Sequence, residues 1–121
     1  GAIAAVGGCD IAAMCGFYLG AASCGVPVVL DGVISCVAAL CARRLCPQAA
    51  GYMLASHVSQ EPAAPVLLDQ LGLRAPIAAG MHLGEGTGAM AVLPLLDAAV
   101  EVYRGCITFE QSGMDAYKVL E

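Results

Sequence analysis

The chain has 121 residues, which suits one domain or part of a larger one, and 60% of these residues are hydrophobic whereas only 12% are charged. Such an apolar chain either contacts a membrane or covers much of its surface with other protein. Ten acidic residues against five basic ones give a formal net charge of −5, which argues against a nucleic-acid-binding protein.

The first half of the chain alternates helix and strand. The expected elements are a helix over 11–23, a buried strand over 26–30 and a helix over 33–45. Cys9 or Asp10 is expected to cap the first helix, and Pro47 ends the second. Residues 11–30 lack charge over the length of a membrane span, but glycines and Pro27 interrupt them, so we expect no span.

The second half repeats the pattern and ends in a long helix. The expected elements are a strand over 52–56, a helix over 62–71, a short strand near Ile77, a helix over 87–103 and a short helix in the tail 106–121. A strand followed by a helix, twice over, is typical of a parallel sheet with crossover helices. The sequence therefore predicts an α/β fold.

Isolated polar residues follow the predicted strands. In parallel sheets the ligand crevice lies beyond the carboxyl ends of the strands. The residues placed there are Asp31 after the first strand, Ser56, His57 and Ser59 after the second, and Glu85 in a comparable loop before a helix. We predict that these loops border one cleft.

The loop around Glu85 is rich in glycine. Gly84, Gly86 and Gly88 are spaced as GxGxG, unlike a dinucleotide-binding fingerprint, and the lysine of a P-loop is missing. A carboxylate among free N–H groups would repel a phosphate, so Glu85 indicates a base. The alternative is an acidic residue in the first turn of a helix, where the helix dipole favours it.

The other polar residues also have structural alternatives. Asp31 is a common turn and N-cap residue, Ser59 could cap the third helix, and His57 could be a loop histidine with ordinary hydrogen bonds. Arg43 and Arg44 lie late in a helix, where they complement its dipole.

The seven cysteines form no CxxC pair, and their odd number argues against a closed set of disulfides. We expect reduced thiols in a reducing compartment. Neither His57 nor His82 has metal-ligand spacing to a cysteine pair, so no metal site is predicted.

Five motifs stand out in order along the chain: GGCDIAAM at 7–14, PVVLDGVIS at 27–35, ASHVSQEP at 55–62, LGEGTGA at 83–89 and ITFE at 107–110. Together they resemble one enzyme family, that of nicotinate-nucleotide:dimethylbenzimidazole phosphoribosyltransferase. The match is to the carboxy-terminal part of that family. The resemblance implies a Rossmann-like, three-layer parallel sheet with crossover helices, incomplete here, in a homodimer. Residues 1–105 would belong to the catalytic α/β domain and 106–121 to a small helical subdomain.

The resemblance also implies an activity. The family moves phosphoribose from nicotinate mononucleotide to 5,6-dimethylbenzimidazole or a related base, giving α-ribazole 5′-phosphate and nicotinate for cobalamin synthesis. It needs no metal or other cofactor, and a cytoplasmic location is expected. The family's catalytic base falls on Glu85, and its nucleotide site includes Asp31 and Ser59. Leu83, Gly84 and Gly86 of the glycine-rich loop are further candidates for substrate binding.

Two departures from the family pattern stand out. Asp10 replaces the usual glutamate, and the family's amino-terminal two-thirds, with a glycine-rich phosphate loop and a lysine near the phosphate, has no counterpart here. The alternative function is therefore a non-catalytic interaction module, or an inactive fragment that needs the missing part.

Overall fold

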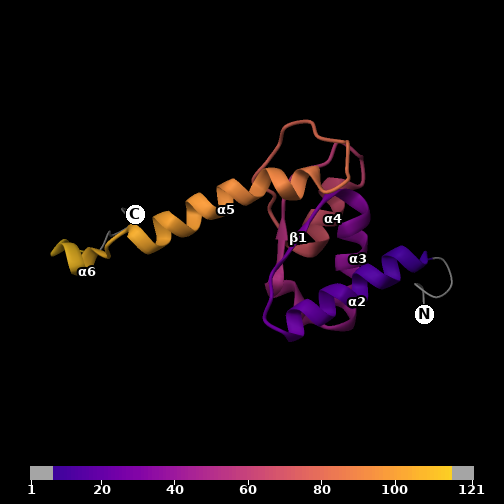
Figure 1. The fold of residues 1–121 in the computed structure, drawn as a ribbon, viewed down its shortest axis with the longest axis horizontal. Coiled ribbons are helices and arrows are strands. Elements are labelled where there is room, and N and C mark those ends of the chain that lie inside the picture. Colours follow the sequence, from indigo (N-terminus) through magenta and orange to yellow (C-terminus); the bar gives the residue numbers. More distant parts are fainter. Residues whose placement is uncertain (1–6, 116–121) are drawn as a thin grey trace, which may run out of the picture.

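The computed structural model of the protein describes residues 7–115. Residues 1–6, at the start of the first predicted domain, and 116–121, at the end of the second, lie outside the described residues. The elements are α2 (Cys9–Ser23), β1 (Val28–Leu30), α3 (Gly32–Leu45), the 3-10 helix η1 (Pro47–Tyr52), β2 (Met53–Ala55), α4 (Ala64–Leu71), α5 (Thr87–Gly105) and α6 (Phe109–Ser112) (Figure 1). The helices and strands predicted within these residues are present, apart from the strand near Ile77, and η1 is an addition.

The two strands form a parallel sheet. Val28 of β1 pairs with Met53 of β2, and the register continues to Leu30 opposite Ala55. Ile77, predicted to form a short strand, makes only an isolated parallel bridge to His57. The structure therefore confirms an α/β chain with a small parallel sheet, and within 7–115 the sheet has two strands.

Helix α3 lies at the centre of the core. It packs against α2, α4 and β1, and its buried face consists largely of Ala38, Ala39 and Ala42, which are fully inaccessible to solvent. Because alanine has only a methyl side chain, the neighbouring helices can approach the α3 backbone closely. Leu30 and Met53 of the sheet complete the same core.

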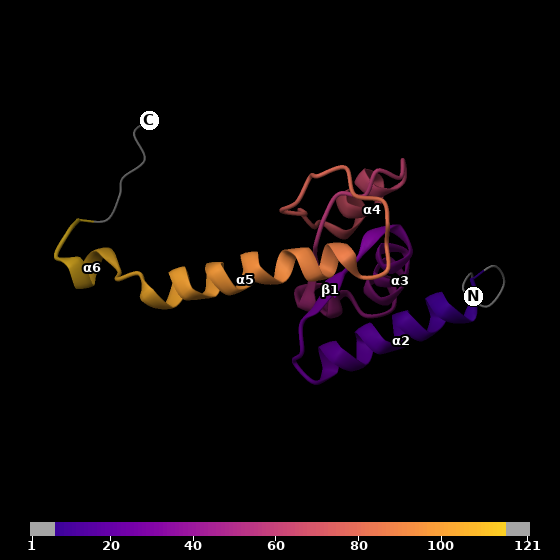
Figure 2. The same cartoon turned by 45° about the horizontal axis from the view of Figure 1, so that its top comes forward.

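Helix α5 leaves this body after its first turns and carries α6 at its far end (Figures 1 and 2). Only Gly88 and Val92 of α5 are buried. Its exposed apolar side chains are Met90, Leu93, Leu95, Val100, Val102 and Tyr103. No helix within 7–115 combines the length and hydrophobicity needed to cross a membrane. An apolar surface of this extent is typical of a contact with other protein.

None of the helices α2, α3 and α4 has the side-chain cap that the sequence suggested as a prediction or an alternative. Helix α2 is capped by Gly8 without a side-chain hydrogen bond, so neither Cys9 nor Asp10 has that role. Helix α4 begins at Ala64 after the N-cap Ala63, and Ser59 lies too far upstream to cap it. Asp31 occupies the N-cap position of α3 but makes no side-chain bond to that helix.

Candidate active site

The loop that presents Glu85 has an unusual backbone. Among residues 7–115, Glu85 is the only residue other than glycine with a positive φ, at 56°, and it stands between Gly84 at 75° and Gly86 at 79°. The N–H and the hydroxyl of Thr87 both donate to the Gly84 carbonyl, at 3.0 and 2.7 Å, and close the turn. Holding a side chain in this conformation costs about 1 kcal/mol or more, and such strain tends to occur at functional sites.

Asp31 anchors this loop from the end of β1. The Gly86 N–H donates to Asp31 Oδ2 and the Ala89 N–H donates to Oδ1, each over 3.0 Å. Both donors belong to the amino-terminal end of α5, whose first N–H groups lack partners within the helix. Asp31 thus acts as the cap of α5, supplied from a distant part of the chain, and its position determines where Glu85 is held.

His57 lies beside Asp31 at the end of β2. The Ser56 hydroxyl donates to the Leu30 carbonyl at 2.6 Å, so we assign it as the acceptor of a 2.9 Å hydrogen bond from His57 Nδ1–H. His57 Nδ1 is 3.9 Å from Asp31 Oδ1, and the histidine side chain is only 2% exposed. The imidazole is therefore held in one orientation between the two strand ends and α5.

Gly88 in the first turn of α5 allows this arrangement. A Cβ at that position would overlap His57 at Nδ1 and Cε1 and would lie 2.8 Å from Asp31 Oδ1. The third glycine of the loop is thus required by packing against the histidine. The sequence motif contains this glycine, but its spacing alone does not reveal which side chain it accommodates.

These residues border one cleft with a volume of about 210 Å³. It is lined by Asp31, Gly32, Val33, Ile34, His57, Ser59, Glu61, His82, Leu83, Gly84 and Glu85. The prediction that Asp31, Ser59 and Glu85 meet at one cleft is confirmed. Gly86 is not among the lining residues, and its N–H is bonded to Asp31 instead. Ligand pockets usually have volumes of about 300–1,000 Å³, so this cleft is smaller than a typical ligand pocket.

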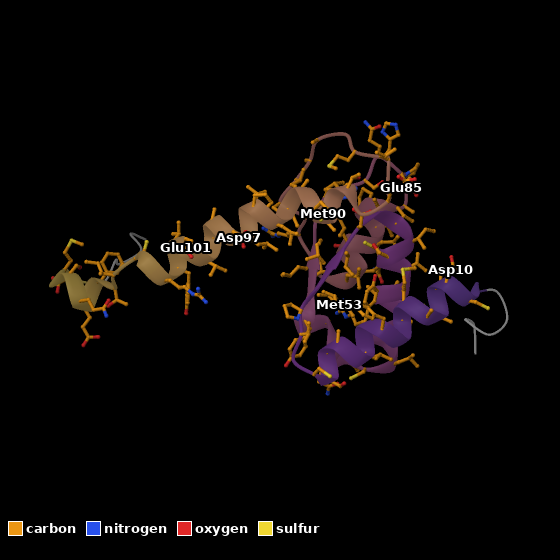
Figure 3. All side chains as sticks on the ribbon, viewed as in Figure 1. Asp10, Met53, Glu85, Met90, Asp97 and Glu101 are labelled. Atoms are coloured by element: carbon orange, nitrogen blue, oxygen red, sulfur yellow. The ribbon has the colours of Figure 1, made fainter. Side chains whose placement is uncertain are left out.

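The cleft is acidic. Asp31, Glu61 and Glu85 line it together with two histidines, and none of the lining residues is lysine or arginine. Within the described residues, no group of three His, Cys, Asp or Glu side chains is arranged to hold a metal ion. Glu85 is exposed at the edge of the body where α5 begins, whereas Asp97 and Glu101 lie on the projecting part of α5 (Figure 3). The arrangement suits a carboxylate that accepts a proton from a bound ligand.

The chain matches known proteins over nearly its whole length. A family model described as phosphoribosyltransferase (DBI_PRT) matches residues 1–114. The nicotinate-nucleotide–dimethylbenzimidazole phosphoribosyltransferase of Salinispora tropica is 49% identical over 94% of this chain and 31% of the relative, and that of Desulforamulus reducens is 46% identical over 90% and 31%. A crystal structure of the Thermus thermophilus enzyme superposes with a TM-score of 0.85 at 37% identity, covering 95% of this chain and 34% of that one. The chain thus spans about a third of the length of these relatives.

Proposed function

This chain belongs to the DBI_PRT phosphoribosyltransferase family. We propose that it supplies the catalytic base and part of the nucleotide site of an enzyme. That enzyme transfers phosphoribose from nicotinate mononucleotide to 5,6-dimethylbenzimidazole or a related base. The observation that carries the proposal is the strained Glu85, held at the cleft by Asp31. The names of the relatives support the substrates. Products would be α-ribazole 5′-phosphate and nicotinate.

The proposed chemistry needs a base more than an acid. The bond between the sugar C1′ and the pyridinium nitrogen breaks, and its electron pair returns to that nitrogen, so the leaving ring needs no proton. The unprotonated ring nitrogen of the benzimidazole forms the new bond to C1′. This alkylation makes the N–H on the other ring nitrogen acidic, and Glu85 accepts that proton. A positioned general base contributes about 10²–10⁴-fold to the rate.

Asp31 has two tasks in this proposal. Both of its carboxylate oxygens already accept a backbone N–H, but each oxygen has a second lone pair that a ribose hydroxyl can use. Ser59 is 5% exposed, and its hydroxyl accepts a weak 3.4 Å hydrogen bond from the Glu61 N–H. Within the described residues the Ser59 hydroxyl donates to no partner, so we propose that its proton contacts the nucleotide.

The base would lie against the glycine-rich loop. Leu83 and Gly84 line the cleft, and Leu83 is 72% exposed, so its apolar side chain is available to a flat ring. Met81, Met90 and Leu93 are close to Glu85 along the chain but are not among the lining residues. We propose that Leu83 and the backbone at Gly84 contact the flat ring, and that Gly86 acts through its bond to Asp31.

The phosphate must be held by other parts of the enzyme. Among residues 7–115, no lysine or arginine lines the acidic cleft, whereas a phosphate needs cationic groups or N–H donors. We therefore propose that activity requires the two-thirds of the relatives' length that this chain does not span, and "complete enzyme" below means both parts together. The exposed face of α5 would be covered by that part or by the second subunit of a homodimer.

The wider architecture follows from the same proposal. The two-stranded parallel sheet would be one portion of a Rossmann-like three-layer sheet, with residues 1–105 in the catalytic domain and 106–121 in a helical subdomain. All seven cysteines have free thiols, which favours a reducing cytoplasm.

The test is an assay of α-ribazole 5′-phosphate formation, for this chain alone and for the complete enzyme. We expect turnover only for the complete enzyme. The second candidate, a non-catalytic interaction module, is favoured by the exposed apolar face of α5. If the complete enzyme shows no transfer activity, that result would support this second candidate and refute the proposed function.

A further inference from the structure

His57 has no part in the chemistry above, yet it lies at the junction of three segments. Its Nδ1–H is held by Ser56, whose hydroxyl is in turn bonded to the Leu30 carbonyl at the end of β1. Its ring packs where Gly88 lacks a side chain, beside Asp31. The ring therefore connects the carboxyl ends of both strands to the first turn of α5.

The backbone next to His57 holds the other arm of the same loop. The Val58 N–H donates to the Ile77 carbonyl at 2.8 Å, and the Gln60 N–H donates to the Met81 carbonyl at 3.1 Å. One arm of the Glu85 loop is thus attached to the segment after β2 by main-chain bonds. In the other arm, Gly88 packs against the His57 ring, and the N–H groups of Gly86 and Ala89 donate to Asp31.

We propose that His57 is a positioning residue for Glu85. Its buried imidazole supports the first turn of α5 and the Asp31 carboxylate, and so sets where the strained loop places the Glu85 carboxylate. Without the ring, the turn at Gly88 can move toward the strand ends, and Glu85 moves with it. A displacement of about 1 Å at the reacting groups can lower a rate about a hundred-fold. This role rests on the proposed function of Glu85 as the base.

Three substitutions at His57 in the complete enzyme test the proposal. Asn places an N–H close to the position of Nδ1 and can still donate to Ser56, whereas Gln places its amide close to the position of Nε2. We expect His57→Ala to lower kcat about a hundred-fold while KM for nicotinate mononucleotide stays within about threefold. His57→Asn should recover most of this loss, and His57→Gln should not. Rescue by Gln rather than Asn would mean that Nε2 touches the substrate, and would overturn the proposal.

Hydrogen exchange of the Gly86 and Ala89 amides provides a readout independent of turnover. Both amides donate to Asp31, so His57→Ala should accelerate their exchange, and His57→Asn should restore protection. Unchanged exchange together with a lost kcat would contradict the positioning role. If the wild-type complete enzyme transfers no phosphoribose, the proposed function fails, but the exchange rates still decide whether His57 holds the loop.

Gly88 allows the same contact to be disturbed from the α5 side. Gly88→Ala should lower kcat because its Cβ would overlap the His57 ring, while Gly51→Ala, with open space around it, serves as the control. Adding Gly88→Ala to His57→Ala should cost less than Gly88→Ala alone, because only the overlap with Asp31 Oδ1 at 2.8 Å then remains, and the two changes are non-additive. Independent, additive losses would overturn the proposal. If His57→Ala does not fold, the Asn and Gln variants make the same distinction.

Discussion

Asp31→Asn is the substitution that most directly tests how the loop is anchored. Asp31 accepts two backbone N–H bonds from the start of α5, and its side chain is only 15% exposed. A hydrogen bond to a charged group contributes about 1.5–3 kcal/mol to stability. Asparagine keeps one acceptor oxygen but loses the charge and turns an NH₂ group toward the other N–H. We therefore expect the free energy of unfolding to fall by about 1.5–3 kcal/mol.

The assay is urea unfolding of the complete enzyme, with the slope m compared between variants so that a shift in midpoint can be attributed to stability. Steady-state kinetics on the same preparations should show kcat lowered and KM for nicotinate mononucleotide raised, because Asp31 both anchors Glu85 and contacts the sugar. Asp69→Asn, on an exposed position of α4, is the matched control and should change stability by less than about 0.5 kcal/mol. An Asp31→Asn enzyme as stable as this control would refute the anchoring role.

Three further predictions follow from the site and the core. Glu85→Gln in the complete enzyme should lower kcat by about 10²–10⁴-fold, while isothermal titration shows nicotinate mononucleotide still bound; near-normal turnover would leave Glu85 as a residue of the helix start only. Burial raises the pKa of the Cys36 thiol from 9.0 to about 11, so the folded chain holds this proton more tightly than the unfolded chain. Its contribution to stability is then complete below pH 9 and is lost as the pH rises toward 11, and urea midpoints of Cys36→Ala should show a weaker decline over that window. Finally, light scattering of the isolated chain at micromolar concentration should show association, because α5 exposes a long apolar face; a stable monomer would contradict this.

The sequence alone predicts most of the helices and strands because their signals are local, although Ile77 makes only an isolated bridge. Continuous Val and Leu runs predict the buried strands, prolines and glycines mark the ends of helices, and the glycines around Glu85 predict a loop that presents a carboxylate. The rule for parallel sheets then placed Asp31, Ser59 and Glu85 at one edge, where the structure has them. The 3-10 helix η1 has only weak local signals and was not predicted.

The partners of the polar side chains depended on the tertiary structure. Asp31 occupies the N-cap position of the helix that follows it, as local sequence suggests, but its carboxylate caps α5, more than fifty residues later, because the carboxyl end of β1 points at the start of that helix. The contact of His57 with Gly88 likewise joins segments that are distant in the sequence. Periodicity and spacing report what a residue favours among its chain neighbours. Which N–H groups a carboxylate accepts, and which glycine accommodates a buried ring, is decided only when distant segments pack together.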